Sequence, residues 1–139
     1  MTRRVNACLS LALLSLAAGC AGNQSSDATL TEIQRMRNGG IDVVMLAPAG
    51  ALKQTRNYCT VEFRSAAAQR LVDVGTVKVR TSMTMEGAPM DGFVTEPKQV
   101  ATGRYTVEMV LAMIGDWSVT IEWMGPAGAG TVSFPALVR

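Results

Sequence analysis

The chain has 139 residues and a formal net charge of +2, and it contains no histidine. Two of its basic residues, Arg3 and Arg4, lie at the extreme N-terminus, so the rest of the chain is formally neutral and offers no basic stripe for nucleic acid. Without histidine the usual general base, the Ser-His-Asp and Cys-His arrangements and the commonest zinc ligand are missing. We therefore expect a protein that is not an enzyme and does not bind nucleic acid.

The first residues predict export. Arg3 and Arg4 precede an apolar run over 7–18, which is shorter than the roughly 20 residues that a membrane-spanning helix needs. A basic start followed by a short apolar run is typical of a secretory signal peptide. The segment Leu16-Ala-Ala-Gly-Cys20 resembles the bacterial lipobox, whose cysteine is acylated and becomes the first mature residue. The alternative is an ordinary signal peptide that is cut at a small-residue site.

On this interpretation, residues 1–19 are a lipoprotein signal peptide and Cys20 carries acyl chains. The chains would hold the protein on the periplasmic side of a bacterial membrane without spanning it. Ala21 is not the aspartate that retains lipoproteins at the inner membrane, which favours the outer membrane.

The segment 20–40 is polar at its start, and we expect it to be a tether between the lipid and a folded domain. Leu30, Ile33 and Met36 have helical spacing and predict a short helix within it. Cys59 is the one remaining cysteine. Because it alternates with apolar residues, we interpret it as a small core residue, the alternative being a thiol that pairs with another chain.

From residue 41 onward the apolar residues alternate with a period of two, which indicates strands with one buried face. About seven strands are expected in residues 41–139, separated by Gly- and Pro-containing turns. They are Ile41–Leu46, Tyr58–Arg64, Thr76–Met85, Phe93–Glu96, Arg104–Leu111, Trp117–Trp123 and Thr131–Val138. This pattern predicts an all-β fold, an immunoglobulin-like antiparallel β-sandwich, although the Cys…Trp…Cys spacing of true immunoglobulins is missing.

Two methionine-containing segments are predicted to meet at one end of this sandwich. Met83 and Met85 end one strand and Met90 follows in the turn, whereas Met113 and Trp117 flank a later turn. If Phe93–Glu96 is a strand, successive strands change direction so that both turns lie at the same end. Met45, Met109 and Met124 are interpreted as ordinary packing residues.

These segments resemble the YtkA-like and FixH-like domains of bacterial envelope proteins. The matching motifs are Met83-x-Met85 with Met90, then Gly103-Arg-Tyr105, then Met113-Ile-Gly-Asp-Trp117. The resemblance implies an immunoglobulin-like sandwich outside the cytoplasm, and an association with copper handling or with the assembly of copper-containing oxidases. The chain departs from the family pattern at Thr84, where proline is common, and at Ala88-Pro89, which alters the turn. It also lacks the histidines of some copper-handling relatives and has a predicted lipid anchor in place of a membrane helix.

Thioether sulfur is a soft ligand that suits Cu(I). We therefore expect Met83, Met85, Met90 and Met113 to bind Cu(I), with Trp117 shielding the site. A copper-efflux or oxidase-assembly complex of the envelope is the expected protein partner. The alternative is a metal-free accessory module whose methionines are packing or docking residues. Glu86, Asp91 and Asp116 are explained by turn and capping roles.

Overall fold

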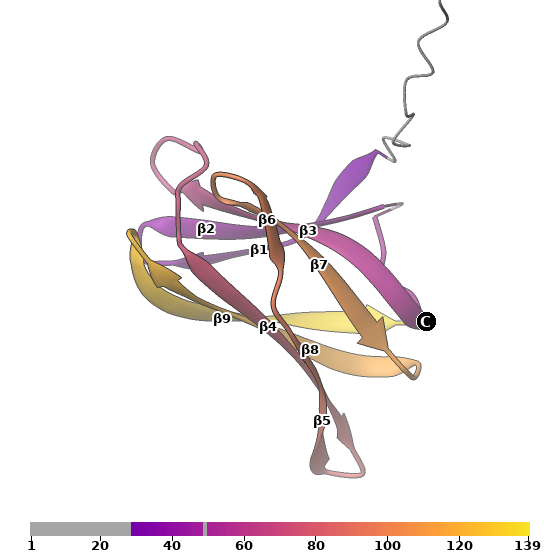
Figure 1. Cartoon of the computed structure of the whole chain (residues 1–139). Coiled ribbons are helices and arrows are strands. Elements are labelled where there is room, and N and C mark those ends of the chain that lie inside the picture. The colour runs from indigo at the N-terminus through magenta and orange to yellow at the C-terminus, as the bar shows by residue number, and fades with distance from the viewer. Residues whose placement is uncertain (1–28, 49) are drawn as a thin grey trace, which may run out of the picture.

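The computed structural model describes residues 29–48 and 50–139, and in these ranges it contains nine strands and no helix (Figure 1). The strands are β1 Leu30–Asn38, β2 Ile41–Pro48, β3 Thr55–Ser65, β4 Thr76–Met85, β5 Ala88–Thr95, β6 Lys98–Ala101, β7 Arg104–Leu111, β8 Gly115–Gly125 and β9 Gly128–Val138. The predicted signal peptide and Cys20 lie outside the described residues. None of the described segments is a helix long and apolar enough to cross a membrane.

The strands form two antiparallel sheets. One has five strands in the order β1-β2-β3-β7-β6, and the other has four in the order β5-β4-β8-β9. The two sheets face each other, with β1 approaching β9 along one side and β5 approaching β7 along the other. This arrangement confirms the all-β antiparallel sandwich that the alternating sequence predicts. Seven of the strands correspond to the expected ones, and β1 and β6 are additional.

The segment 30–38 corrects a sequence prediction, because it is strand β1 and neither tether nor helix. It forms a hairpin with β2, with Asn38 opposite Ile41. The pairing shifts between Glu32 and Gln34, so Ile33 is an extra residue in a β-bulge. The bulge allows Ile33 and Met36 both to pack against the core although they are an odd number of residues apart. The spacing of three between Ile33 and Met36, which is typical of a helix, is therefore caused by the bulge.

The core lies between the sheets and is built from the inward positions of the alternating strands. Phe63 lies at its centre, with ring centroids 5.6 Å from Tyr105 and 5.4 Å from Trp123, both in edge-to-face geometry. Met45 and Met109 are buried, as expected of packing residues. Met124 is not: its side chain is 72 % exposed, because it follows the inward-facing Trp123 and the pleat turns it to the outer face of β8.

One end of the sandwich, here called the methionine end, collects the functional candidates. The strand register places there the turn between β4 and β5, the connection between β7 and β8, the start of β1 and the chain's C-terminus, since Leu30 pairs with Pro48 and Gly115 with Val138. The opposite end contains the turns that join β1 to β2 and β8 to β9.

Candidate functional site

The β4–β5 hairpin extends beyond the body of its sheet. Strand β4 pairs with β8 as far as Met83, which lies opposite Trp117, but it continues to Met85 paired with β5 alone. The last residues therefore form a two-stranded ribbon that projects from the sandwich (Figure 1). The ribbon closes through Glu86 and Gly87, which have φ of 49° and 82°. Positive φ at both central residues is the geometry of a type I′ turn.

Three methionines share one face of this ribbon. Met83 lies directly opposite Met90, and Met85 is two residues further along β4, on the same face. Side chains directly opposite each other in an antiparallel pair have Cβ atoms about 5 Å apart, and diagonal neighbours are also within reach of long side chains. Met83 is 8 % exposed, Met90 is half-buried and Met85 is 42 % exposed. The three thioethers thus run from the edge of the core out toward solvent.

Met113 and Trp117 lie beside this ribbon. The indole Nε1 of Trp117 donates a hydrogen bond of 2.9 Å to the backbone oxygen of Met113, which fixes the β7–β8 connection against β8. A Cβ atom on Gly115 would lie 3.1 Å from Cε of Met83, so the end of the Met83 side chain reaches this connection. The structure therefore brings all four predicted methionine residues and Trp117 to the same end of the sandwich.

The carboxylates near this end occupy different positions. Asp91 lies opposite Ser82, on the ribbon face away from the methionines, and Asp116 alternates with the inward-facing Trp117. Among the described residues no three His, Cys, Asp or Glu side chains are grouped so that they could hold a metal ion. The methionine face therefore offers thioether sulfur on a side of the ribbon that Asp91 does not share.

Cys59 does not belong to this site. Its thiol is buried in β3, and burial raises its pKa to about 11, because the thiolate is disfavoured away from water. The interpretation of Cys59 as a core residue is confirmed. Pairing with another chain would require the sandwich to open.

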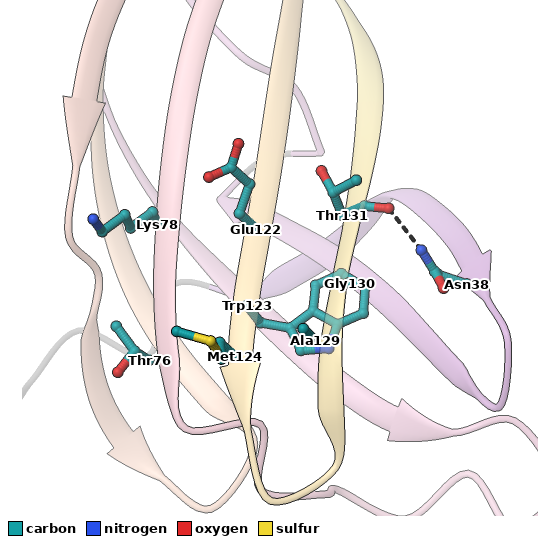
Figure 2. Close-up of a pocket in the computed structure, with 9 residues that line it drawn as sticks. All are labelled: Asn38, Thr76, Lys78, Glu122, Trp123, Met124, Ala129, Gly130 and Thr131. Carbon is teal, nitrogen blue, oxygen red and sulfur yellow. Dashed lines mark hydrogen bonds between the residues drawn. The ribbon is translucent and has the colours of Figure 1, made fainter.

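A pocket of about 640 Å³ lies near the opposite end of the four-stranded sheet (Figure 2). Its lining residues are Asn38, Thr76, Lys78, Glu122, Trp123, Met124, Ala129, Gly130 and Thr131. The Trp123 ring packs on the backbone of Gly130, where a Cβ atom would lie 2.2 Å from Cζ2. Its buried Nε1 has no hydrogen-bond partner among the described residues. No sequence motif indicated this pocket, because its residues come from four strands, β1, β4, β8 and β9, that only the fold brings together.

Comparison with known families settles the relationship of the chain. The model of the YtkA-like family matches residues 40–122, which is more than half of the sequence. The chain belongs to the YtkA-like family. The match begins just before β2 and ends within β8, so it includes every residue of the methionine site.

This YtkA-like fold also resembles a solved structure. FetP of uropathogenic E. coli strain F11, recombinantly expressed in the periplasm of E. coli, superposes with a TM-score of 0.52 at 12 % sequence identity. The superposition covers 76 % of this chain and 93 % of FetP. At this identity the likeness concerns the fold alone. A search among curated proteins found no match to the YtkA-like chain.

Proposed function

We propose that this YtkA-like protein binds Cu(I) through the thioethers of Met83, Met85 and Met90 and that it acts in the bacterial envelope. The observation that supports the proposal best is the register of the β4–β5 hairpin, in which Met83 faces Met90 and Met85 follows on the same face. Three soft, uncharged ligands on one short ribbon make a set that suits Cu(I). Met113 is the proposed fourth ligand, and Trp117 limits access of water from the side of the core.

The exposure of Met85 argues against a purely structural explanation. A methionine that only fills the core is expected to be buried, as Met45 and Met109 are. Met85 instead lies past the last pairing with β8 and is half exposed on a projecting ribbon. A metal ion held there would be accessible to a partner protein that delivers or receives it.

The proposed setting is the periplasmic side of a membrane, with the protein anchored by acyl chains on Cys20. The lipobox-like sequence supports the anchor, and the family relationship is compatible with an envelope protein. We propose a copper-efflux or oxidase-assembly complex as the partner. The alternative function is a metal-free accessory module that docks through the same end, where Ile114 and Leu137 are also exposed.

A Cu(I) competition titration tests the proposal. A soluble form that begins after Cys20 would compete with a chromogenic chelator under reducing conditions. It must retain residues 30–38, because β1 is part of the sheet. We expect one Cu(I) per chain, and we expect this binding to be lost when Met83, Met85 and Met90 are all changed to Leu. Leucine conserves the volume of methionine, so the fold should survive, with a cost of roughly 1.5 kcal/mol or less per site.

The matched control is Met124→Leu, which removes an exposed methionine from the opposite end and should leave Cu(I) affinity unchanged. A wild-type protein that does not compete would refute copper binding and leave the docking function. A triple variant that still binds with wild-type affinity would refute the assignment of the ligands.

A further inference from the structure

The outer face of the five-stranded sheet carries more positive than negative side chains, six Lys and Arg residues against four Asp and Glu residues. Eleven Lys and Arg residues follow Arg4 in the sequence, and alternation along the strands places six of them on this face. They are Arg35, Arg37, Arg56, Arg64, Lys98 and Arg104. The four acidic residues on the face are Glu32, Asp42, Glu62 and Glu108, and two of these, Asp42 and Glu62, are buried.

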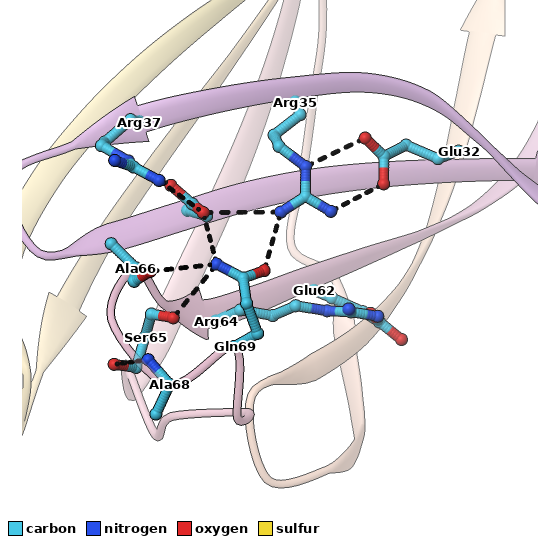
Figure 3. Close-up of polar contacts among 10 residues, drawn as sticks. Glu32, Arg35, Arg37, Glu62, Arg64, Ser65, Ala66, Ala68 and Gln69 are labelled. Carbon is cyan, nitrogen blue, oxygen red and sulfur yellow. Dashed lines mark hydrogen bonds and ion pairs between the residues drawn. The ribbon is translucent and has the colours of Figure 1, made fainter.

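Two arginines of β1, Arg35 and Arg37 (Figure 3), donate hydrogen bonds to the buried carboxylate of Asp42. Arg37 donates from Nε and Nη2 to its two carboxylate oxygens at 2.6 and 3.1 Å. Arg35 Nη1 reaches Oδ2 at 3.4 Å, and Gln69 Nε2 donates to the same oxygen at 2.8 Å. Arg35 is in turn held by Glu32, at 3.0 and 2.8 Å. These bonds hold the two guanidinium groups in place over the sheet.

Glu62 is arranged in the same way in the neighbouring strands. Arg64 and Arg104 each donate from Nε to a different carboxylate oxygen at 2.8 Å, and each also makes an ion pair through Nη2. Asp42 pairs across the strands with Arg64, and Glu62 pairs with Arg104. The four arginines therefore form one continuous group around two buried carboxylates.

The arginines keep unused hydrogen-bonding capacity on their outer side. A guanidinium has five N–H donors, and Arg37 and Arg104 direct Nε and Nη2 to the carboxylates below them. Among the described residues their Nη1 groups have no partner, and the side chains are 61 % and 46 % exposed. Pre-oriented guanidinium groups with free donors match the geometry of phosphate oxygens.

We propose that this face docks on the headgroups of an anionic phospholipid surface. The face has a formal excess of two positive charges, and Tyr58, half exposed on it, is a residue type enriched at membrane interfaces. The sheet also contains β1, whose first residue follows Cys20 by ten positions. The placement of this sheet rests on the proposed acylation of Cys20: nine intervening residues reach at most about 30 Å when extended, so the anchor would hold this sheet near the bilayer. The methionine ribbon belongs to the other sheet and would stay free.

The outer face of the four-stranded sheet provides an internal comparison. It carries Lys78 and Arg80, but Glu122 lies directly opposite Lys78, and Thr and Ser fill most of the other outward positions. An anionic surface should therefore discriminate between the two faces of the same molecule.

Arginine footprinting on the full-length protein tests the proposal. The protein would be reconstituted into vesicles of phosphatidylcholine, with or without phosphatidylglycerol, and modified with phenylglyoxal before mass spectrometry. We expect modification of Arg37 and Arg104 to slow severalfold when phosphatidylglycerol is present, and to recover in high salt. Modification of the exposed Arg80, on the other face, should not change.

Two double variants with equal charge change complete the test. Arg56→Gln with Lys98→Gln removes two cations that do not hold the buried carboxylates, and it should weaken the interaction with phosphatidylglycerol by about tenfold or more. Lys78→Gln with Arg80→Gln should have little effect. Equal protection of Arg80, or no protection by phosphatidylglycerol, would overturn the proposal. Protection of Arg37 and Arg104 by inorganic phosphate or by polyglutamate, with neutral vesicles, could also equal the protection by phosphatidylglycerol. That result would overturn the proposal too, because it would indicate a free anion or an acidic polypeptide as the ligand.

Discussion

Asp42 illustrates how a single residue can carry much of the pH dependence of this fold. Hydrogen bonds from Arg37 and Gln69 stabilise its charged form, and they hold the pKa of its carboxyl group far below the ordinary value of 3.8, although burial acts in the opposite direction. A depressed pKa in the folded state means that the unfolded chain binds the proton first. The stabilisation by Asp42 is therefore complete above its ordinary pKa and is lost as the pH falls below it.

We predict that the melting temperature falls steeply between about pH 5 and pH 2, and that Asp42→Asn lowers it at neutral pH while flattening this dependence. Glu32→Gln is the control, because Glu32 is much more exposed and its pKa is lowered mainly by the single partner Arg35. Thermal unfolding measured across the pH range tests the prediction. Parallel curves for the wild type and Asp42→Asn would show that another group dominates.

The methionines show at the residue scale what the sequence could and could not predict. The alternation of β4 placed Met83 and Met85 on one face, and the structure has them there. Alternation could not show that the pairing of β4 with β8 ends at Met83. Met85 lies beyond the last paired residue and is therefore exposed. The interpretation of Met124 as a packing residue is wrong, because Met124 directly follows the inward-facing Trp123 and therefore lies on the outer face of β8.

At the scale of elements, the β4–β5 hairpin depends on its two-residue turn. Type I′ turns require positive φ at both central residues and favour Asn-Gly. Here Glu86 occupies the first position with a φ of 49°, which is costly for a residue other than Gly, Asn or Asp. This turn sets the register in which Met83 faces Met90. The unfavourable backbone conformation of Glu86 is therefore part of the proposed site.

We predict that Glu86→Asn raises the free energy of unfolding by about 0.5–1 kcal/mol, because asparagine tolerates the left-handed conformation. Glu86→Gln removes the same charge without this tolerance and should give no gain. Urea denaturation of both variants distinguishes the two effects. An equal gain from Gln would attribute the effect to charge and contradict the conformational explanation.

Strand β1 shows why one element was mispredicted. Its hydrophobic residues are few, and the bulge at Ile33 shifts their period from two to three, which is close to the period of a helix. The strand is held by its register with β2 and by contacts with β9, where Gln34 and Asn38 donate to the backbone oxygens of Pro135 and Thr131 at 3.1 and 2.8 Å. Such long-range partners leave no local signal in the sequence.

At the scale of the whole molecule, the sandwich follows from alternation, and the shared methionine end follows from the antiparallel order of the strands. Phe93 proved to lie in a strand, as this placement required. The arrangement of the arginines could not be predicted in this way, since Asp42, Arg64 and Arg104 come from β2, β3 and β7 and are neighbours only through the sheet order. The same is true of the pocket beside Trp123.

The central claim is that the hairpin binds Cu(I) through sulfur, and X-ray absorption at the copper edge of the loaded protein tests it most directly. The account predicts the edge of Cu(I) and a first shell of sulfur only, which should disappear in the triple Met→Leu variant. Because the chain contains no histidine, imidazole cannot contribute. A first shell of nitrogen or oxygen, or a sulfur shell that persists in the variant, would contradict the account.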